Sequence, residues 1–99
     1  MSISSITPRK LWETQHGRCF HCDGIMSPWS ADNPNGIGWT REHFIPKKFL
    51  RKMEEGAPKF NIVLAHAKCN RQRGSKYPTK EEVQKFSSIY TELFEKFGV

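Results

Sequence analysis

The feature that most constrains this chain is the placement of its three cysteines. Cys19 and Cys22 form one pair with two residues between them, and His66 and Cys69 form a second pair with the same spacing. Two such pairs offer four sulfur and nitrogen atoms, the donor set that zinc binds in tetrahedral sites. An odd number of cysteines also excludes a complete set of internal disulfides. We therefore predict a structural zinc site made by these four residues.

Parts of this pattern admit other interpretations. A single pair of cysteines at this spacing can be a redox pair, but redox pairs usually begin a helix in a βαβ setting, which is absent here. His16 and His21 lie beside and inside the first pair and can compete as ligands. We expect them instead to be exposed or to contact phosphates. With four protein ligands and no open position, the zinc would stabilise the fold without taking part in a reaction.

The length of the chain makes such a zinc site important. Ninety-nine residues, 36% of them hydrophobic, suit one domain with a thin core, so we expect a single domain over residues 1–99. The N-terminus lacks the long apolar run of a secretory signal, and we expect no membrane span. We expect an intracellular, cytoplasmic protein whose thiols stay reduced and available to zinc.

Hydrophobic periodicity predicts a small α+β fold. The last helix, over residues 79–97, is amphipathic and begins at a capping box of Thr79 and Glu82. Its apolar stripe, which starts at Val83, is expected to pack on the core. The other expected elements are a helix over 8–15, a loop over 23–38, strands over 39–45 and 62–65, a short helix near 48–55 and a helix over 67–73.

Positive charge is concentrated in the second half of the chain. Residues 41–76 contain ten Lys or Arg residues and three acidic residues, whereas the whole chain has a net charge of +6. Such a concentration favours a polyanionic partner, because neutralising phosphates releases counterions. A solvated basic face that aids solubility is the alternative. We predict DNA contacts from Arg41, Lys47, Lys48, Arg51, Arg71, Arg73 and Lys76.

Chemically useful side chains occur in three short motifs within this basic region. Glu42 and His43 lie before Pro46, Asn61 begins an apolar run, and Asn70 directly follows the second zinc pair. A histidine can take a proton near neutral pH. Carboxylate and amide oxygens can hold a hard divalent cation that stabilises charge on a phosphate. Because adjacent strand residues point to opposite faces, residues 42 and 43 can share a site only if the strand ends or bulges there.

Taken in this order and framed by the zinc pairs, residues 19–74 resemble the HNH endonuclease family. The resemblance implies a ββα-metal (His-Me finger) fold: a hairpin of the two predicted strands, followed by the helix over 67–74. It implies that His43 is the general base and that Asn61 orders the loop that orients His43. Glu42 and Asn70 would hold one catalytic Mg²⁺ or Mn²⁺. The family more often has Asp and His at these two positions, and we expect the weaker amide ligand to favour Mn²⁺ in vitro.

Two functions from different classes fit this sequence. The first is an endonuclease that nicks double-stranded DNA with weak sequence preference, acting as a monomer, or as a homodimer that breaks both strands. The second is a non-catalytic, zinc-stapled module that binds nucleic acid. Charge and the zinc pairs fit both functions, and only Glu42, His43 and Asn70 distinguish them.

Overall fold

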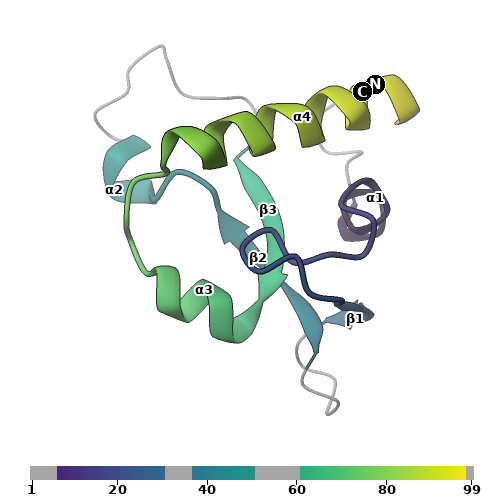
Figure 1. Cartoon of the computed structure of the whole chain (residues 1–99), viewed down its shortest axis with the longest axis horizontal. Coiled ribbons are helices and arrows are strands. Elements are labelled where there is room, and N and C mark those ends of the chain that lie inside the picture. The colour runs from purple at the N-terminus through teal and green to yellow at the C-terminus, as the bar shows by residue number, and fades with distance from the viewer. Residues whose placement is uncertain (1–6, 31–36, 51–60, 98–99) are drawn as a thin grey trace.

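A computed structural model describes residues 7–30, 37–50 and 61–97 of the chain. It shows a small α+β fold with a three-stranded sheet, which confirms the predicted fold class (Figure 1). The elements, in chain order, are α1 (Pro8–Thr14), β1 (Ser27–Ser30), β2 (Gly38–His43), α2 (Lys47–Leu50), β3 (Ile62–His66), α3 (Ala67–Arg73) and α4 (Lys80–Phe97).

The strands β2 and β3 carry several of the residues that the sequence singled out. β2 pairs with β3 in antiparallel register, from Trp39 opposite His66 to His43 opposite Ile62. α3 follows β3 without an intervening residue and packs against both strands. The end of β2 therefore lies beside the start of β3, and α3 packs on both strands.

The structure corrects the expected loop over residues 23–38. Ser27–Ser30 form strand β1, which pairs in parallel with β2 through a register shift. Serine and proline are typical of turns, and Pro28 has no N–H to donate, so this segment can be a strand only at the edge of a sheet. The pairing with β2 therefore overrides the local preference. The predicted helix near 48–55 begins at Lys47, and residues 51–60 lie outside the described part of the chain.

The core lies between the sheet and the helices α1 and α4, which come from opposite ends of the chain. It contains Leu11 of α1, Leu64 of β3 and Ile89 of α4, together with the first zinc-pair residue, Cys19, which is 0% exposed. Gln15, directly after α1, also bonds to the backbone of β3: its amide donates to the carbonyl oxygen of Leu64 at 2.9 Å and accepts from the Leu64 N–H at 2.9 Å. This arrangement leaves no exposed hydrogen-bonding groups at Leu64.

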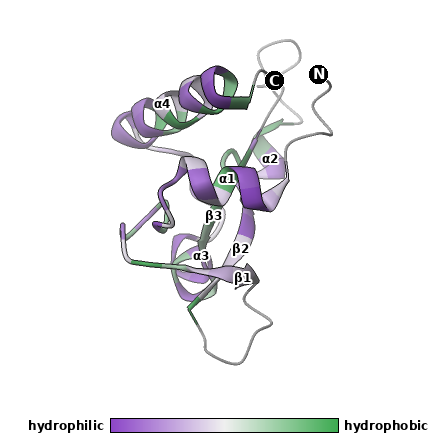
Figure 2. Cartoon of the chain, turned by 90° about the vertical axis from the view of Figure 1, so that its right-hand side faces the viewer, coloured by the Kyte–Doolittle hydropathy of each residue, from purple (hydrophilic) through white to green (hydrophobic). Residues whose placement is uncertain are grey.

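α4 covers one end of the sheet with an amphipathic surface (Figure 2). Its capping box forms as predicted: the N–H of Thr79 donates to Glu82 Oε1 at 2.9 Å, and the N–H of Glu82 donates to Thr79 Oγ1 at 3.2 Å. Tyr90 and Leu93 are buried, whereas Val83, in the first part of the predicted stripe, is 43% exposed. Among the described residues, no helix has both the length and the apolar character that crossing a membrane requires.

We expect Tyr90→Phe to destabilise the protein. The Tyr90 hydroxyl donates to the carbonyl oxygen of Ile62 and accepts from the Ile62 N–H at 3.3 Å, so the variant should lose about 1–3 kcal/mol of unfolding free energy. Burial raises the pKa of Tyr90 to about 12, from 10.0 in an unfolded chain. The folded state therefore keeps this proton between these pH values while the unfolded state loses it, and stability falls as pH rises through that window.

Urea unfolding of parent and variant at neutral and at alkaline pH measures both effects. The difference in stability between the two proteins should shrink as pH rises above 10. Equal unfolding free energies at neutral pH would contradict the role assigned to the hydroxyl.

Candidate functional site

The four predicted zinc ligands come together in one cluster. The ligand atoms of Cys19, Cys22, His66 and Cys69 all lie within 4.8 Å of one another. Nδ1 of His66 is 3.4 Å from Cys22 Sγ and 4.0 Å from Cys69 Sγ. The first pair lies in the turn between α1 and β1, His66 ends β3, and Cys69 lies in α3. A cluster of three sulfurs and one nitrogen can hold zinc.

Hydrogen bonds around the cluster orient its ligands. Nε2 of His66 lies 2.9 Å from the carbonyl oxygen of Ile25. A carbonyl only accepts, so Nε2 carries the proton and Nδ1 presents its lone pair to the cluster. Two backbone N–H groups donate to the sulfurs: that of Gly24 to Cys22 Sγ at 3.3 Å, and that of His66 to Cys19 Sγ at 3.4 Å. These contacts arrange the donors as a metal site requires.

The pKa values of two of the clustered cysteines are shifted in opposite directions. The backbone N–H of Gly24 lowers the pKa of Cys22. Burial, with a further contribution from the side chain of Cys19, raises the pKa of Cys69 to about 12. Three neighbouring thiolates repel one another, and a bound zinc ion would supply the positive charge that stabilises them.

Zinc affinity is expected to depend on pH for this reason. At neutral pH the thiol of Cys69 is protonated without metal, so zinc must displace its proton. We expect the apparent affinity to rise about tenfold per pH unit for each proton displaced, between about pH 6 and pH 8. Competition with a chromophoric zinc chelator measures this slope. A flat profile would show that the thiols are already ionised in the apo protein.

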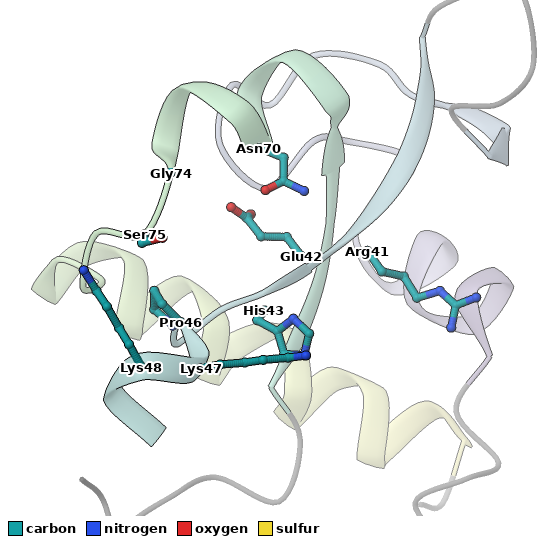
Figure 3. A pocket seen from close by; sticks show the side chains of 9 residues that line it. All are labelled: Arg41, Glu42, His43, Pro46, Lys47, Lys48, Asn70, Gly74 and Ser75. Carbon is teal, nitrogen blue, oxygen red and sulfur yellow. The ribbon is translucent and has the colours of Figure 1, made fainter. Parts of the chain in front are cut away.

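A second site lies where β2 ends. Glu42 and His43 are the last two residues of β2; Glu42 is buried and His43 is exposed, and both line one open pocket of about 360 Å³. Asn70 of α3 lines the same pocket, as do Lys47 and Lys48 of α2 (Figure 3). The pairing with β3 continues regularly through both residues, so the alternation of the strand still turns Glu42 inward and His43 outward. The strand neither ends nor bulges between them, and the two side chains line the same pocket from different sides of β2.

Glu42 is the most buried member of this pocket, with 4% of its side chain exposed. Its Oε2 lies 2.5 Å from Nε2 of His21. Its Oε1 lies 3.5 Å from Nη1 of Arg73, within ion-pair range, but no described group forms a hydrogen bond to it. A buried carboxylate oxygen without a hydrogen bond is costly, and a hard cation is the ligand that such an oxygen favours. This side chain therefore fits a divalent cation.

Asn70 presents the second oxygen. Its Nδ2 donates to Thr40 Oγ1 at 3.4 Å, and that hydroxyl donates to the carbonyl oxygen of Ala65 at 2.9 Å. Because the nitrogen is engaged with β2, the amide oxygen Oδ1 remains for the pocket. Figure 3 shows the amide of Asn70 and the carboxylate of Glu42 turned toward one another. Together they offer two oxygen donors from different elements.

Asn61 fixes the segment that follows His43. Its Oδ1 accepts from the N–H of Ile45 at 2.7 Å, and its Nδ2 donates to the carbonyl oxygen of Ile45 at 2.8 Å. Its own carbonyl oxygen accepts from the N–H of Phe44 at 2.9 Å. The backbone directly after His43 is thus tied to the start of β3, and Asn61 is a positioning residue that acts through this backbone.

Five of the basic residues that are predicted to contact DNA are exposed. Arg41, Lys47 and Lys48 are exposed and line the pocket, and Arg71 and Lys76 are exposed nearby on and after α3. Arg51 lies outside the described residues.

The predicted DNA contact of Arg73 does not fit its placement. Only 8% of its side chain is exposed, and its guanidinium donates to the carbonyl oxygens of His43 at 3.1 Å and Phe44 at 2.6 Å. Those bonds and the nearby carboxylate of Glu42 occupy the group inside the protein. Arg73 therefore braces the end of β2 against α3 instead of facing a phosphate.

His21 is the residue at this site that the sequence did not reveal. The sequence predicts that His21 is exposed or contacts a phosphate, but only 16% of its side chain is exposed, because the ring turns inward from the first zinc pair toward Glu42. No spacing or local motif links residues 21 and 42, since their contact depends on how the turn packs on β2.

No family model matches the chain, and no curated protein matches it.

Proposed function

We propose that this chain is a metal-dependent endonuclease that hydrolyses DNA phosphodiester bonds, as its resemblance to the HNH family implies. The observation that carries the proposal is the shared pocket of Glu42, His43 and Asn70, which the end of β2 and α3 bring together. The antiparallel pair β2 and β3, followed directly by α3, supports the proposal that these elements form a ββα-metal unit.

The residues divide the chemistry between them. Glu42 and Asn70 would hold one Mg²⁺ or Mn²⁺, which supplies positive charge to the scissile phosphate and its leaving oxygen. The imidazole of His43 makes no hydrogen bond or ion pair with any residue that the structure describes, and it is exposed at the pocket. It is free to take the proton of the attacking water as a general base. Asn61 keeps the backbone beside His43 in place.

The surroundings of the pocket suit a nucleic-acid backbone. Arg41, Lys47 and Lys48 line the pocket itself, and Arg71 and Lys76 are exposed on and after α3, the helix that carries Asn70. Contacts of this kind position phosphates without reading bases, which favours weak sequence preference. One site cuts one strand, so a monomer would nick duplex DNA.

Supercoiled plasmid tests this function. Zinc-loaded protein is incubated with the plasmid in buffer that contains Mg²⁺, Mn²⁺ or neither ion. We expect nicked circles only when one of the two ions is added. Glu42→Gln keeps the size of the side chain but removes its charge, and it should lose cleavage, whereas Glu95→Gln, at an exposed position of α4, should cut as the parent does.

Binding of the same plasmid without cleavage under either ion would overturn the proposal. The protein would then be the non-catalytic, zinc-stapled module that binds nucleic acid. Gel-shift assays on the same samples distinguish this outcome from a protein that does not bind DNA at all.

A further inference from the structure

We propose that His21 is a positioning residue for the catalytic cation: it holds Oε2 of Glu42 so that Oε1 is presented beside Asn70. This inference rests on the function proposed above. The turn that carries Cys19 and Cys22 would then link the two metal sites, because it also carries His21, which orients the cation ligand Glu42.

The contact between His21 and Glu42 is short and enclosed. The two side chains are 16% and 4% exposed, and 2.5 Å separates Nε2 from Oε2. An ionised carboxylate can only accept, so Nε2 carries the proton and donates it to this bond. Oε2 is thereby committed to the protein, while Oε1 has no hydrogen-bond donor among the described groups. The pair leaves Oε1, which has Arg73 Nη1 at 3.5 Å as an ion-pair neighbour but no hydrogen bond, as the oxygen that a cation can bind.

Such an anchor matters more for glutamate than for aspartate. Glu42 has one more rotatable bond than the aspartate that is usual in the family, so an unanchored carboxylate would sample more orientations. Ordering it when the cation binds would cost free energy and lower the affinity. A hydrogen bond to Oε2 imposes that order beforehand, which is the effect that partners of metal ligands have in general.

His21 is itself enclosed on two sides. Its ring packs edge-on against Phe20, with centroids 5.4 Å apart. On the other side, Nδ1 lies 3.7 Å from Oε2 of Glu82, whose Oε1 is engaged by the capping box of α4. Lys85 of α4 also donates to the carbonyl oxygen of Phe20 at 2.6 Å and to Asp23 Oδ1 at 2.7 Å. α4 therefore clamps the turn that carries His21 and contributes more than apolar packing.

Two substitutions at this position are expected to differ in their effect on Mn²⁺ affinity. His21→Phe keeps a ring that can pack on Phe20 but has no donor, whereas the amide nitrogen of His21→Gln can still donate to Oε2. Zinc-loaded proteins are titrated with Mn²⁺, and free Mn²⁺ is measured by electron paramagnetic resonance. We expect His21→Phe to bind Mn²⁺ about 10- to 100-fold more weakly than the parent and His21→Gln to stay much closer to it.

Cleavage assays supply a second readout. The Mn²⁺ concentration that gives half-maximal nicking should rise in His21→Phe by the same factor, while the rate at saturating Mn²⁺ stays near that of the parent. His16→Ala is the matched control, because this histidine is 71% exposed and pairs with Glu92, away from the pocket. Zinc content is measured for every variant. If His21→Phe loses zinc, His21→Ala takes its place, since it has no ring to misfit.

The possible results separate the two proposals. Equal Mn²⁺ affinity of the parent and the donor-free variant, at full zinc content, would overturn the role of His21 alone. Equal losses in the donor-free variant and in His21→Gln would also overturn it, because packing and not the hydrogen bond would then matter. A parent protein that cuts no DNA would instead defeat the proposed function.

Discussion

Replacing His43 with alanine is expected to abolish detectable DNA cleavage while DNA binding and zinc content persist. A general base contributes about 10²- to 10⁴-fold to a rate, and no other described histidine lines the pocket. The side chain is exposed and makes no polar contact within the described ranges, so its loss should change the unfolding free energy by no more than about 0.5 kcal/mol. Nicking rates with enzyme in excess, gel shifts and zinc analysis measure the three properties.

Two controls sharpen this experiment. His16→Ala removes another exposed histidine and should cut at the parental rate. Added imidazole should restore part of the activity of His43→Ala, because the missing side chain leaves room at an exposed position of the pocket. Unchanged cleavage by His43→Ala would show that this residue is not the base, whatever the outcome at Glu42.

Loss of zinc is expected to unfold the protein. Structural zinc contributes on the order of 10 kcal/mol at neutral pH, which is comparable with the whole stability of a small domain. Cys19 is 0% exposed within the core, and its Sγ accepts from the N–H of His66. Cys19→Ser should therefore lose zinc, its cooperative thermal transition and its DNA cleavage together.

Circular dichroism during heating measures this effect, and chelation offers an independent route to the same state. Adding a strong chelator to the parent should abolish the transition, and adding zinc back should restore it. A chelated protein that still unfolds cooperatively at the parental midpoint would contradict the structural role of the site.

Local spacing explains which parts of the fold were predictable. The pairs Cys19 with Cys22 and His66 with Cys69 each bring their side chains together within one turn, so a cluster of four possible zinc ligands could be predicted from the sequence. The bounds of α3 also matched the prediction, because Gly74, with a φ of 63°, ends the helix as glycine commonly does. The capping box likewise fixed the start of α4.

Long-range packing explains what the sequence could not show. β1 forms because β2 offers it a partner, although Ser27 and Pro28 are typical of a turn. His21 and Arg73 are both polar residues that sequence reasoning placed at the surface, yet both face the carboxylate of Glu42. A pattern of residue types indicates which side chains carry charge or protons, but the direction in which each points depends on elements far away in the chain.

The buried position of Glu42 gives a second reason to expect a metal ion at this residue. The resemblance to a family assigns Glu42 a metal-binding role from its place in a motif. The structure adds that one of its oxygens is bonded to His21 while the other lacks a hydrogen-bond donor among the described groups. That asymmetry is a physical reason to expect a cation at this position, and it does not depend on the motif.

The most direct test of this account is the position of a manganese ion. Crystals of zinc-loaded His43→Ala are grown with Mn²⁺ and a short DNA duplex, and anomalous scattering is recorded at the manganese edge. The account predicts a manganese peak bonded to Glu42 and Asn70, with a phosphate oxygen of the DNA beside it. A peak elsewhere, or a Glu42 carboxylate that contacts only His21 and Arg73 while DNA is bound, would contradict it.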